Sequence, residues 1–218
     1  MPATRVDKFP LAKSGWPYLA GNIIMLLMAM ALEVYSLALI LTLSLLFIIW
    51  FFRDPVRISG PLPPLALLAP ADGRVVALEE VLVPGLGAVK LLSIFMNIFD
   101  VHVNRLPVSG AISHIEHVAG GFNPADRPWA RIKNERMNLT LTVADGRRLM
   151  ISQVAGLVAQ NIECWVTAPA EGARGQRYGM IRFGSRVDIY MPLDTRLAVS
   201  RGQKVRAGIT VIGIMNDA

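Results

Sequence analysis

The chain has 218 residues, 53% of them hydrophobic, and carries 22 Lys and Arg against 16 Asp and Glu, a net charge of +6. This apolar content is high for a soluble domain and is concentrated before Arg53, which favours membrane association. The single cysteine, Cys164, excludes a disulfide within the chain, and the sequence has no zinc pattern, aromatic stacking motif or recognition helix that would favour nucleic-acid binding.

Two apolar stretches, 16–32 and 34–52, stand on either side of Glu33. Each is near the lower limit of about 20 residues for a membrane-spanning helix. We expect a membrane anchor, and three arrangements stay open: a two-helix hairpin, one tilted span with an interfacial segment, or two helices in one leaflet. Basic residues on both sides favour cytoplasmic ends. A soluble helix pair and a cleavable signal fit less well, because the stretches have no polar face and no small-residue cleavage site.

From residue 67 onward, short aliphatic runs broken by Gly, Pro and Asp predict strands joined by tight turns. The expected strands are 73–78, 89–96, 110–117, 136–143, 148–154, 162–167, 180–183, 187–191 and 210–214. Asp145-Gly146 predicts a hairpin turn. The loop 120–131 is long for a hairpin and is expected near a functional site.

Two segments, 69–75 and 199–208, look like halves of a biotinyl/lipoyl-type barrel. The predicted fold is therefore mainly β, a biotinyl/lipoyl-like β barrel-sandwich preceded by an N-terminal hydrophobic helical anchor. We expect the anchor over 1–57 and a β-rich catalytic domain over 58–218. The alternative is a non-catalytic, membrane-tethered carrier or adaptor, although Lys90 and Lys204 do not stand at the hairpin tip that a carrier would use.

Gly184 and Ser185 stand late in the β-rich region, where a Gly-Ser bond can cleave itself. The Ser185 hydroxyl would attack the Gly184 carbonyl carbon, and glycine leaves room because it has no Cβ. Serine is a weak nucleophile at neutral pH and needs a base. His102 is the candidate, since Asp100, two residues earlier in a strand-like segment, could point the same way. By itself the pair is weak, because Gly-Ser is common in turns.

The pair belongs to the last of four ordered motifs, which are Phe51-Phe52-Arg53-Asp54-Pro55, Pro70-Ala71-Asp72-Gly73-Arg74-Val75, Asp100-Val101-His102-Val103-Asn104-Arg105-Leu106-Pro107 and Phe183-Gly184-Ser185. Together they resemble the phosphatidylserine decarboxylases over nearly the whole chain, and most of all the short, membrane-attached form. The resemblance implies cleavage between Gly184 and Ser185 and conversion of Ser185 into a pyruvoyl cofactor. This group is an electron sink in the decarboxylation of phosphatidylserine to phosphatidylethanolamine.

The resemblance also implies roles for particular residues. The expected catalytic residues are Ser185, His102 and Asp72, and the expected substrate contacts are Asn104, Arg105, His117 and Phe183. Larger relatives often have a second histidine where Arg105 stands, so a relay through that histidine does not transfer. His114 and His117 are three apart in an expected strand and would face opposite sides, which argues against a shared metal.

The expected partners follow from the same resemblance, from the positive charge and from the lack of nucleic-acid and metal-binding patterns in the sequence. They are the phosphatidylserine substrate, anionic membrane lipid, the two self-cleaved fragments held to each other, and a homodimer as a further possibility, with no nucleic acid and no metal. The expected location is the inner cell membrane, with the catalytic domain on the cytoplasmic side.

Overall fold

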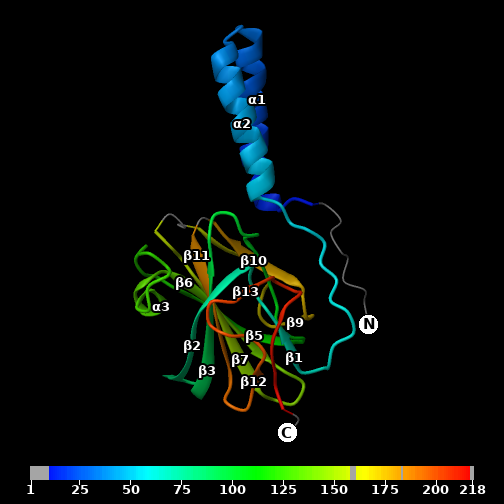
Figure 1. The fold of residues 1–218 in the computed structure, drawn as a ribbon, viewed down its shortest axis with the longest axis vertical. Coiled ribbons are helices and arrows are strands. Elements are labelled where there is room, and N and C mark those ends of the chain that lie inside the picture. The colour runs from blue at the N-terminus through cyan, green and yellow to red at the C-terminus, as the bar shows by residue number, and fades with distance from the viewer. Residues whose placement is uncertain (1–9, 158–160, 183, 217–218) are drawn as a thin grey trace. The chain divides into compact units, whose positions relative to one another are not determined.

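The computed structural model describes residues 10–157, 161–182 and 184–216 and divides into two compact units. One lies within residues 5–56 and is helical, and the other begins at Arg57 and is built mainly of strands (Figure 1). Arg57 therefore belongs to the β unit, one residue earlier than the expected domain boundary.

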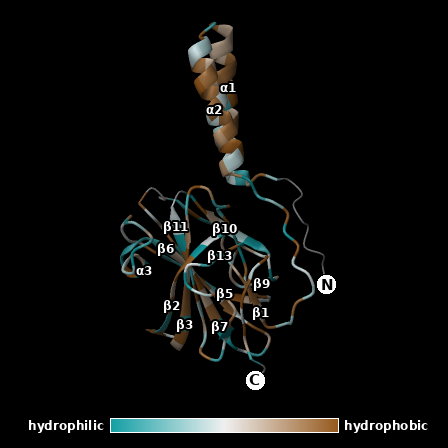
Figure 2. Cartoon of the chain, viewed as in Figure 1, coloured by the Kyte–Doolittle hydropathy of each residue, from teal (hydrophilic) through white to brown (hydrophobic). Residues whose placement is uncertain are grey.

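The helical unit is a hairpin of two apolar helices, α1 (Trp16–Ala31) and α2 (Tyr35–Phe51), preceded by the single 3-10 turn η1 (Lys13–Gly15). Glu33 adopts a φ of 58° in the connection, and Asn22 Nδ2 donates a hydrogen bond to Ser44 Oγ at 3.0 Å across the pair. Hydrophobic residues dominate both helices (Figure 2).

Among the described residues, only the helix over Lys13–Ala31 is long and apolar enough to cross a membrane, by length and composition alone. The second helix is apolar but shorter. The two helices form a hairpin in the structure, and which of the three expected membrane arrangements they adopt stays a prediction.

The β unit has fourteen strands among the described residues, and one short helix, α3 (Ala130–Lys133), between the fifth and the sixth. The strands are β1 (Ala66–Leu68), β2 (Gly73–Val83), β3 (Gly87–Met96), β4 (Val103–Arg105), β5 (Gly110–Val118), β6 (Arg136–Thr142), β7 (Arg148–Val154), β8 (Ile162–Cys164), β9 (Ala170–Gly172), β10 (Arg177–Ile181), β11 (Ser185–Pro192), β12 (Arg196–Leu197), β13 (Lys204–Val205) and β14 (Val211–Ile214). They form an eight-stranded sheet in the order β13-β2-β3-β11-β7-β6-β5-β9 and two three-stranded sheets, β1-β14-β12 and β4-β10-β8. All the strand pairs are antiparallel.

One hydrophobic core joins the three sheets. Ile94 and Ile189 from the large sheet pack in the same buried cluster as Leu67, Tyr178 and Ile212 from the two small ones. Because side chains alternate along a strand, β11 sends every second residue into this core and the others to the opposite face of the sheet. Seven of its eight residues are buried, so β11 is a central strand with both faces covered.

The two segments predicted to be halves of one barrel do lie side by side. Gly208 N donates to Ala69 O at 2.9 Å, and Val75 N donates to Gln203 O at 2.9 Å. The pairing brings the start of the β unit against its C-terminal part.

The strands β3, β5, β6, β7 and β14 agree with the predicted ranges to within two residues. The strand β2 continues to Val83, five residues beyond its expected end at 78, and β8 ends at Cys164, three residues before its expected end at 167. Two predicted strand bounds on either side of the Gly184-Ser185 bond are wrong. The strand expected at 180–183 is β10 and ends at Ile181, whereas β11 begins at Ser185, two residues before its expected start. Short strands such as β4 and β9 were missed because three residues are too few to show a period.

Candidate active site

Ser185 is the first residue of the central strand β11, where it pairs with Met96 at the end of β3. The residue is completely buried, and its hydroxyl has no hydrogen-bond partner among the described residues. Leaving a buried polar group unpaired costs about 1–3 kcal/mol. Ser185 is the residue that is predicted to attack the backbone of its own chain. Its hydroxyl is not hydrogen-bonded to any other group of the described residues.

The peptide bond before Ser185 is held by two glycines. Gly184 has a φ of +63°, in the left-handed region that costs other residues about 1–2 kcal/mol, although the space around it is open. Its carbonyl oxygen lies against Gly156, just after β7, where a β-carbon would stand 1.7 Å from that oxygen. A side chain at position 156 would therefore clash with the Gly184 carbonyl oxygen, whereas a side chain at position 184 would meet no neighbouring atom.

The long loop 120–131 reaches this place, as its length and composition predicted. A β-carbon at Gly156 would stand 3.5 Å from the Ala125 β-carbon, and Ala125 is buried. Nearby, Asn134 Nδ2 donates to Ala155 O at 2.8 Å. The loop thus packs beside the segment that contacts the Gly184 carbonyl.

A buried ion pair fixes the strand immediately after Ser185. Arg186 Nε donates to Asp188 Oδ1 at 2.5 Å, and Arg186 Nη2 donates to Ser93 Oγ of β3 at 2.6 Å. Arg186 Nη1 also donates to Arg127 O at 3.3 Å. Burial raises the pKa of Asp188, and the neighbouring guanidinium opposes that shift. These bonds anchor β11 to β3 and to the long loop on the face opposite the core.

His102 lies directly before β4, and its carbonyl accepts a hydrogen bond from Ile181 N of β10 at 3.4 Å. The residue is completely buried. The strands β4 and β10 pair with each other, and β10 ends three residues before Gly184. The predicted base therefore lies next to β4, and the predicted cleavage site lies shortly after its partner β10.

Asn104, two residues after His102, joins the small sheet to the large one. Gln153 Nε2 of β7 donates to Asn104 Oδ1 at 2.8 Å, and Asn104 Nδ2 contacts Met96 Sδ at 3.6 Å. Met96 is the partner of Ser185 across β3 and β11. Asn104 is therefore buried close to the predicted cleavage site, with its amide engaged by other protein groups.

Asp72 occupies a different position. It precedes β2, which is separated from β11 by β3, so its backbone stands about 10 Å from that of Ser185. Arg57 donates to both carboxylate oxygens, with 2.7 Å from Nη2 to Oδ2, and Ala207 N donates to Oδ1 at 2.7 Å. The strand order thus separates Asp72 from Ser185, and its carboxylate ties residue 57 to the C-terminal part of the chain.

The other predicted contacts are spread over the β unit. Arg105 is buried and donates from Nη1 to Gly175 O at 3.0 Å. His117 lies on β5 with half of its side chain exposed, and its Nε2 is 3.1 Å from Glu135 Oε1. Phe183 is outside the described residues. Arg105 and His117 belong to different sheets, so they do not form one cluster.

Sequence reasoning missed the residues that hold the cleavage site in place. Arg186 and Asp188 have a recognisable signal, because two opposite charges two positions apart in an apolar strand share one face. Gly156 and Gln153 have no such signal, since their importance comes from contacts with distant parts of the chain.

Comparison with known proteins agrees with the resemblance that the sequence motifs indicate. The phosphatidylserine decarboxylase family model matches residues 45–213. The phosphatidylserine decarboxylase proenzymes of Ralstonia pickettii and Cupriavidus taiwanensis are each 45% identical to this chain, covering 93% of it and 94% of their own length. That of Cupriavidus pinatubonensis is 44% identical over 95% of this chain and 96% of its own.

We predict that Gly156→Ala blocks cleavage at the Gly184-Ser185 bond, with a rate at least about 100-fold lower, because the new methyl group displaces the carbonyl that is attacked. Gly184→Ala should be milder, about tenfold, since only backbone strain opposes it. The rate is measured by the appearance of the shorter fragments on a denaturing gel.

Gly110→Ala is the matched control. Its β-carbon would stand 2.6 Å from Thr142 O, a milder clash that is also with a backbone oxygen, in the pairing of β5 with β6. This variant should lose stability but still cleave. Cleavage of Gly156→Ala at the unmodified rate would contradict the prediction.

Proposed function

Because this chain belongs to the phosphatidylserine decarboxylase family, we propose that it cleaves itself between Gly184 and Ser185 and then decarboxylates phosphatidylserine to phosphatidylethanolamine. Its relatives are named proenzymes, which supports processing into two fragments. The observation that carries the proposal is the buried Ser185 hydroxyl, unpaired among the described residues, directly after a glycine of positive φ. The comparisons favour this enzyme over the carrier or adaptor.

The self-cleavage uses atoms of the chain and one water. Ser185 Oγ attacks the Gly184 carbonyl carbon, the C–N bond breaks, and the proton moves from the hydroxyl to the Ser185 nitrogen, which leaves an ester. Loss of the Ser185 α-proton then expels the Gly184 carboxylate and leaves dehydroalanine. Hydrolysis releases the nitrogen as ammonia and leaves a ketone at position 185.

The site fits the resulting pyruvoyl group, because the atoms that form it are already buried at the start of a central strand. When formed, the group supplies a ketone that binds the substrate amine and accepts electrons as carbon dioxide leaves. His102 takes the Ser185 proton in the first step and returns a proton to the substrate carbon after decarboxylation. Burial beside β10 holds its backbone and limits the water around the ring.

The other assigned residues act around this centre. Asp72 acts on the cleavage by positioning, through the hydrogen bonds that it accepts from Arg57 and from Ala207 N. Asn104 orients the substrate through an amide that Gln153 already positions. Arg105, His117 and Phe183 remain proposed contacts to the phosphate, the carboxylate or the acyl portion.

The same proposal covers the fold type and location. Pairing between 69–75 and 199–208 supports a biotinyl/lipoyl-like barrel-sandwich. The apolar helix hairpin supports an anchor, with the enzyme on the cytoplasmic side of the inner membrane. Anionic lipid and a homodimer stay proposed partners, the former because of the positive net charge.

The two fragments remain associated after cleavage. Residues 185–218 supply the central strand β11 and also β12, β13 and β14. Val187, Ile189, Met191 and Ile212 from this segment are completely buried in the core, and burial of each such side chain contributes about 1.5–3 kcal/mol. The hydrophobic term is therefore the main force that holds the fragments together.

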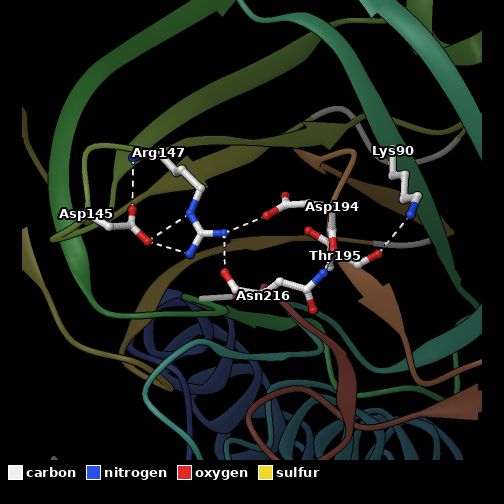
Figure 3. A network of polar contacts seen from close by, with 6 residues as sticks. All are labelled: Lys90, Asp145, Arg147, Asp194, Thr195 and Asn216. Carbon is white, nitrogen blue, oxygen red and sulfur yellow. Dashed lines mark hydrogen bonds and ion pairs between the residues drawn. The ribbon is translucent and has the colours of Figure 1, made fainter. Parts of the chain in front are cut away.

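A polar clasp adds to this association (Figure 3). Arg147, before the cleavage site, binds Asp194 at 2.9 Å and Asn216 O at 2.8 Å, both after it. Lys90 Nζ likewise donates to Thr195 O at 2.9 Å. Arg147 also binds Asp145, and this hydrogen bond lowers the pKa of that carboxyl. Partly exposed ion pairs contribute about 1 kcal/mol or less, so the clasp is secondary to the core.

We predict that Ser185→Ala gives one uncut chain without decarboxylase activity, because no hydroxyl starts the cleavage. Intact-mass analysis of the unmodified protein should show two fragments, and the one that begins at position 185 should lack a free amino terminus. An ordinary N-terminal serine on that fragment, in a fully active enzyme, would mean simple proteolysis.

His102→Gln should slow cleavage by about 100-fold or more, since a positioned base contributes about 10²–10⁴-fold. His114→Gln is the control and should cleave normally, because His114 lies exposed on β5. The measurement is the time course of fragment formation after synthesis. The reverse ranking would move the base away from the segment 100–107.

The cleaved protein should unfold at a denaturant concentration that depends on protein concentration, because unfolding separates two chains. Ser185→Ala should show no such dependence. In the cleaved protein Arg147→Ala should lower the free energy of unfolding by about 1 kcal/mol and Ile189→Ala by about 2–5 kcal/mol.

The stability should also depend on pH. Because the folded pKa of Asp145 is lowered, its pairing with Arg147 stabilises fully above the unfolded pKa of about 4, and this stabilisation is lost as the pH falls through the folded pKa.

The measurement is denaturant unfolding of detergent-solubilised protein at two concentrations and several pH values. Equal losses for the two alanine variants would contradict the ranking of hydrophobic over ionic contributions.

A further inference from the structure

A polar side chain interrupts an apolar row on the core face of β7. Leu149, Ile151 and Gln153 alternate along this strand, share the core face and are completely buried. Leu149 and Ile151 belong to the hydrophobic core cluster, whereas Gln153 places an amide beside it. Burial of an amide is unfavourable unless hydrogen bonds satisfy both of its ends. The partners of the Gln153 amide therefore indicate its role.

Only the nitrogen end of this amide is paired among the described residues. Gln153 Nε2 donates to Asn104 Oδ1 of β4 at 2.8 Å, and a β-carbon at Gly179 of β10 would stand 3.0 Å from the same nitrogen. The other end, Gln153 Oε1, is buried and accepts no hydrogen bond from any described residue. Because nitrogen and oxygen belong to one planar group, the bond to Asn104 also fixes the direction of the unused oxygen.

Gln153 and Ser185 lie on the same face of the large sheet. Gln153 pairs with Val187 across β7 and β11, and Ser185 stands two residues before Val187. Diagonal neighbours on one face of an antiparallel pair are about 7–8 Å apart, within reach of a long side chain. Ser185 Oγ is also buried and unpaired among the described residues. Two unpaired polar atoms thus belong to neighbouring positions on one buried face.

An unpaired carbonyl oxygen selects the chemistry of the group that it binds. It accepts hydrogen bonds and donates none, so it can pair with an amine but not with an ionised carboxylate or phosphate, which are themselves acceptors. Of the charged groups in a phosphatidylserine head, only the amine carries hydrogen. The proposed function brings this amine to position 185, beside the residue that has an unused acceptor.

We propose that Gln153 Oε1 accepts a hydrogen bond from the substrate amine at position 185, in the orientation that the bond to Asn104 fixes. The role of Gln153 follows from the strand pairing and from its unpaired oxygen. The inference rests on the proposed function for the ketone at position 185. Gln153 thereby makes the site selective for a headgroup whose nitrogen carries hydrogen.

The test uses the processed, detergent-solubilised enzyme and short-chain phosphatidylethanolamine, which has the amine but no carboxylate to lose. Cyanoborohydride reduces the link between ketone and amine, and intact mass gives the fraction of the fragment beginning at position 185 that carries lipid. Gln153→Met keeps the length of the side chain without a hydrogen-bonding group. It should raise the lipid concentration for half-maximal labelling about tenfold, as expected for one lost hydrogen bond. Gln153→Glu keeps an oxygen and should raise it less than about threefold.

Ser152→Ala is the matched control. Ser152 precedes Gln153 on β7, is buried, and has a hydroxyl that is also unpaired among the described residues, but it faces the opposite side of the sheet. This variant should label as the unmodified enzyme does. An unchanged concentration for Gln153→Met, or an equal rise in Gln153→Met and Ser152→Ala, would overturn the proposal.

A competitor without an amine separates recognition of the nitrogen from a general change of shape. Short-chain phosphatidylmethanol has the phosphate and the acyl chains, but its headgroup has no hydrogen to donate. Its inhibition constant in the labelling assay should therefore be the same for Gln153→Met and the unmodified enzyme. A parallel tenfold loss for both lipids would show that the substitution only disturbs the site, and would overturn the proposal.

Cleavage of each variant is measured first on a denaturing gel. Gln153→Met and Gln153→Glu should both be processed, because the proposed bond is made to the substrate. An uncut Gln153→Met chain would overturn the proposal by assigning Gln153 to the cleavage step. An unmodified chain that stayed uncut, or that was cut but took up no lipid, would instead contradict the proposed function.

Discussion

Arg186 and Asp188 form an ion pair that is completely enclosed in the β unit, and it fixes the strand that begins at the proposed cleavage site. A buried pair of this kind is weak as a source of stability, but loss of one partner typically costs about 3–5 kcal/mol, so the pair strongly disfavours any arrangement that breaks it. Here it ties β11 to Ser93 of β3 and to the long loop. A shift of β11 by one residue would exchange its two faces and place these charges in the hydrophobic core.

This fixed register holds in place the bond that we propose is cleaved. Ser185 stands where β11 begins, so the bond before it lies outside the regular pairing while the residues after it are fully paired. Gly184 supplies the positive φ, and Gly156 supplies the space for the carbonyl oxygen. The proposed cleavage at this point leaves the strand itself in place. The core and the clasp then hold the second fragment.

The sequence by itself determined the two apolar helices, the long strands and the residues expected to react, because periodicity, charge and ordered motifs are local properties. Family membership followed from the same motifs. Only the tertiary structure decided that β11 begins at Ser185, that Gly156 contacts the Gly184 carbonyl and that Asp72 is bound by Arg57 about 10 Å of backbone away from Ser185. Short strands and contacts between residues 15 or more positions apart leave no periodic signal, since their energy comes from packing against distant segments.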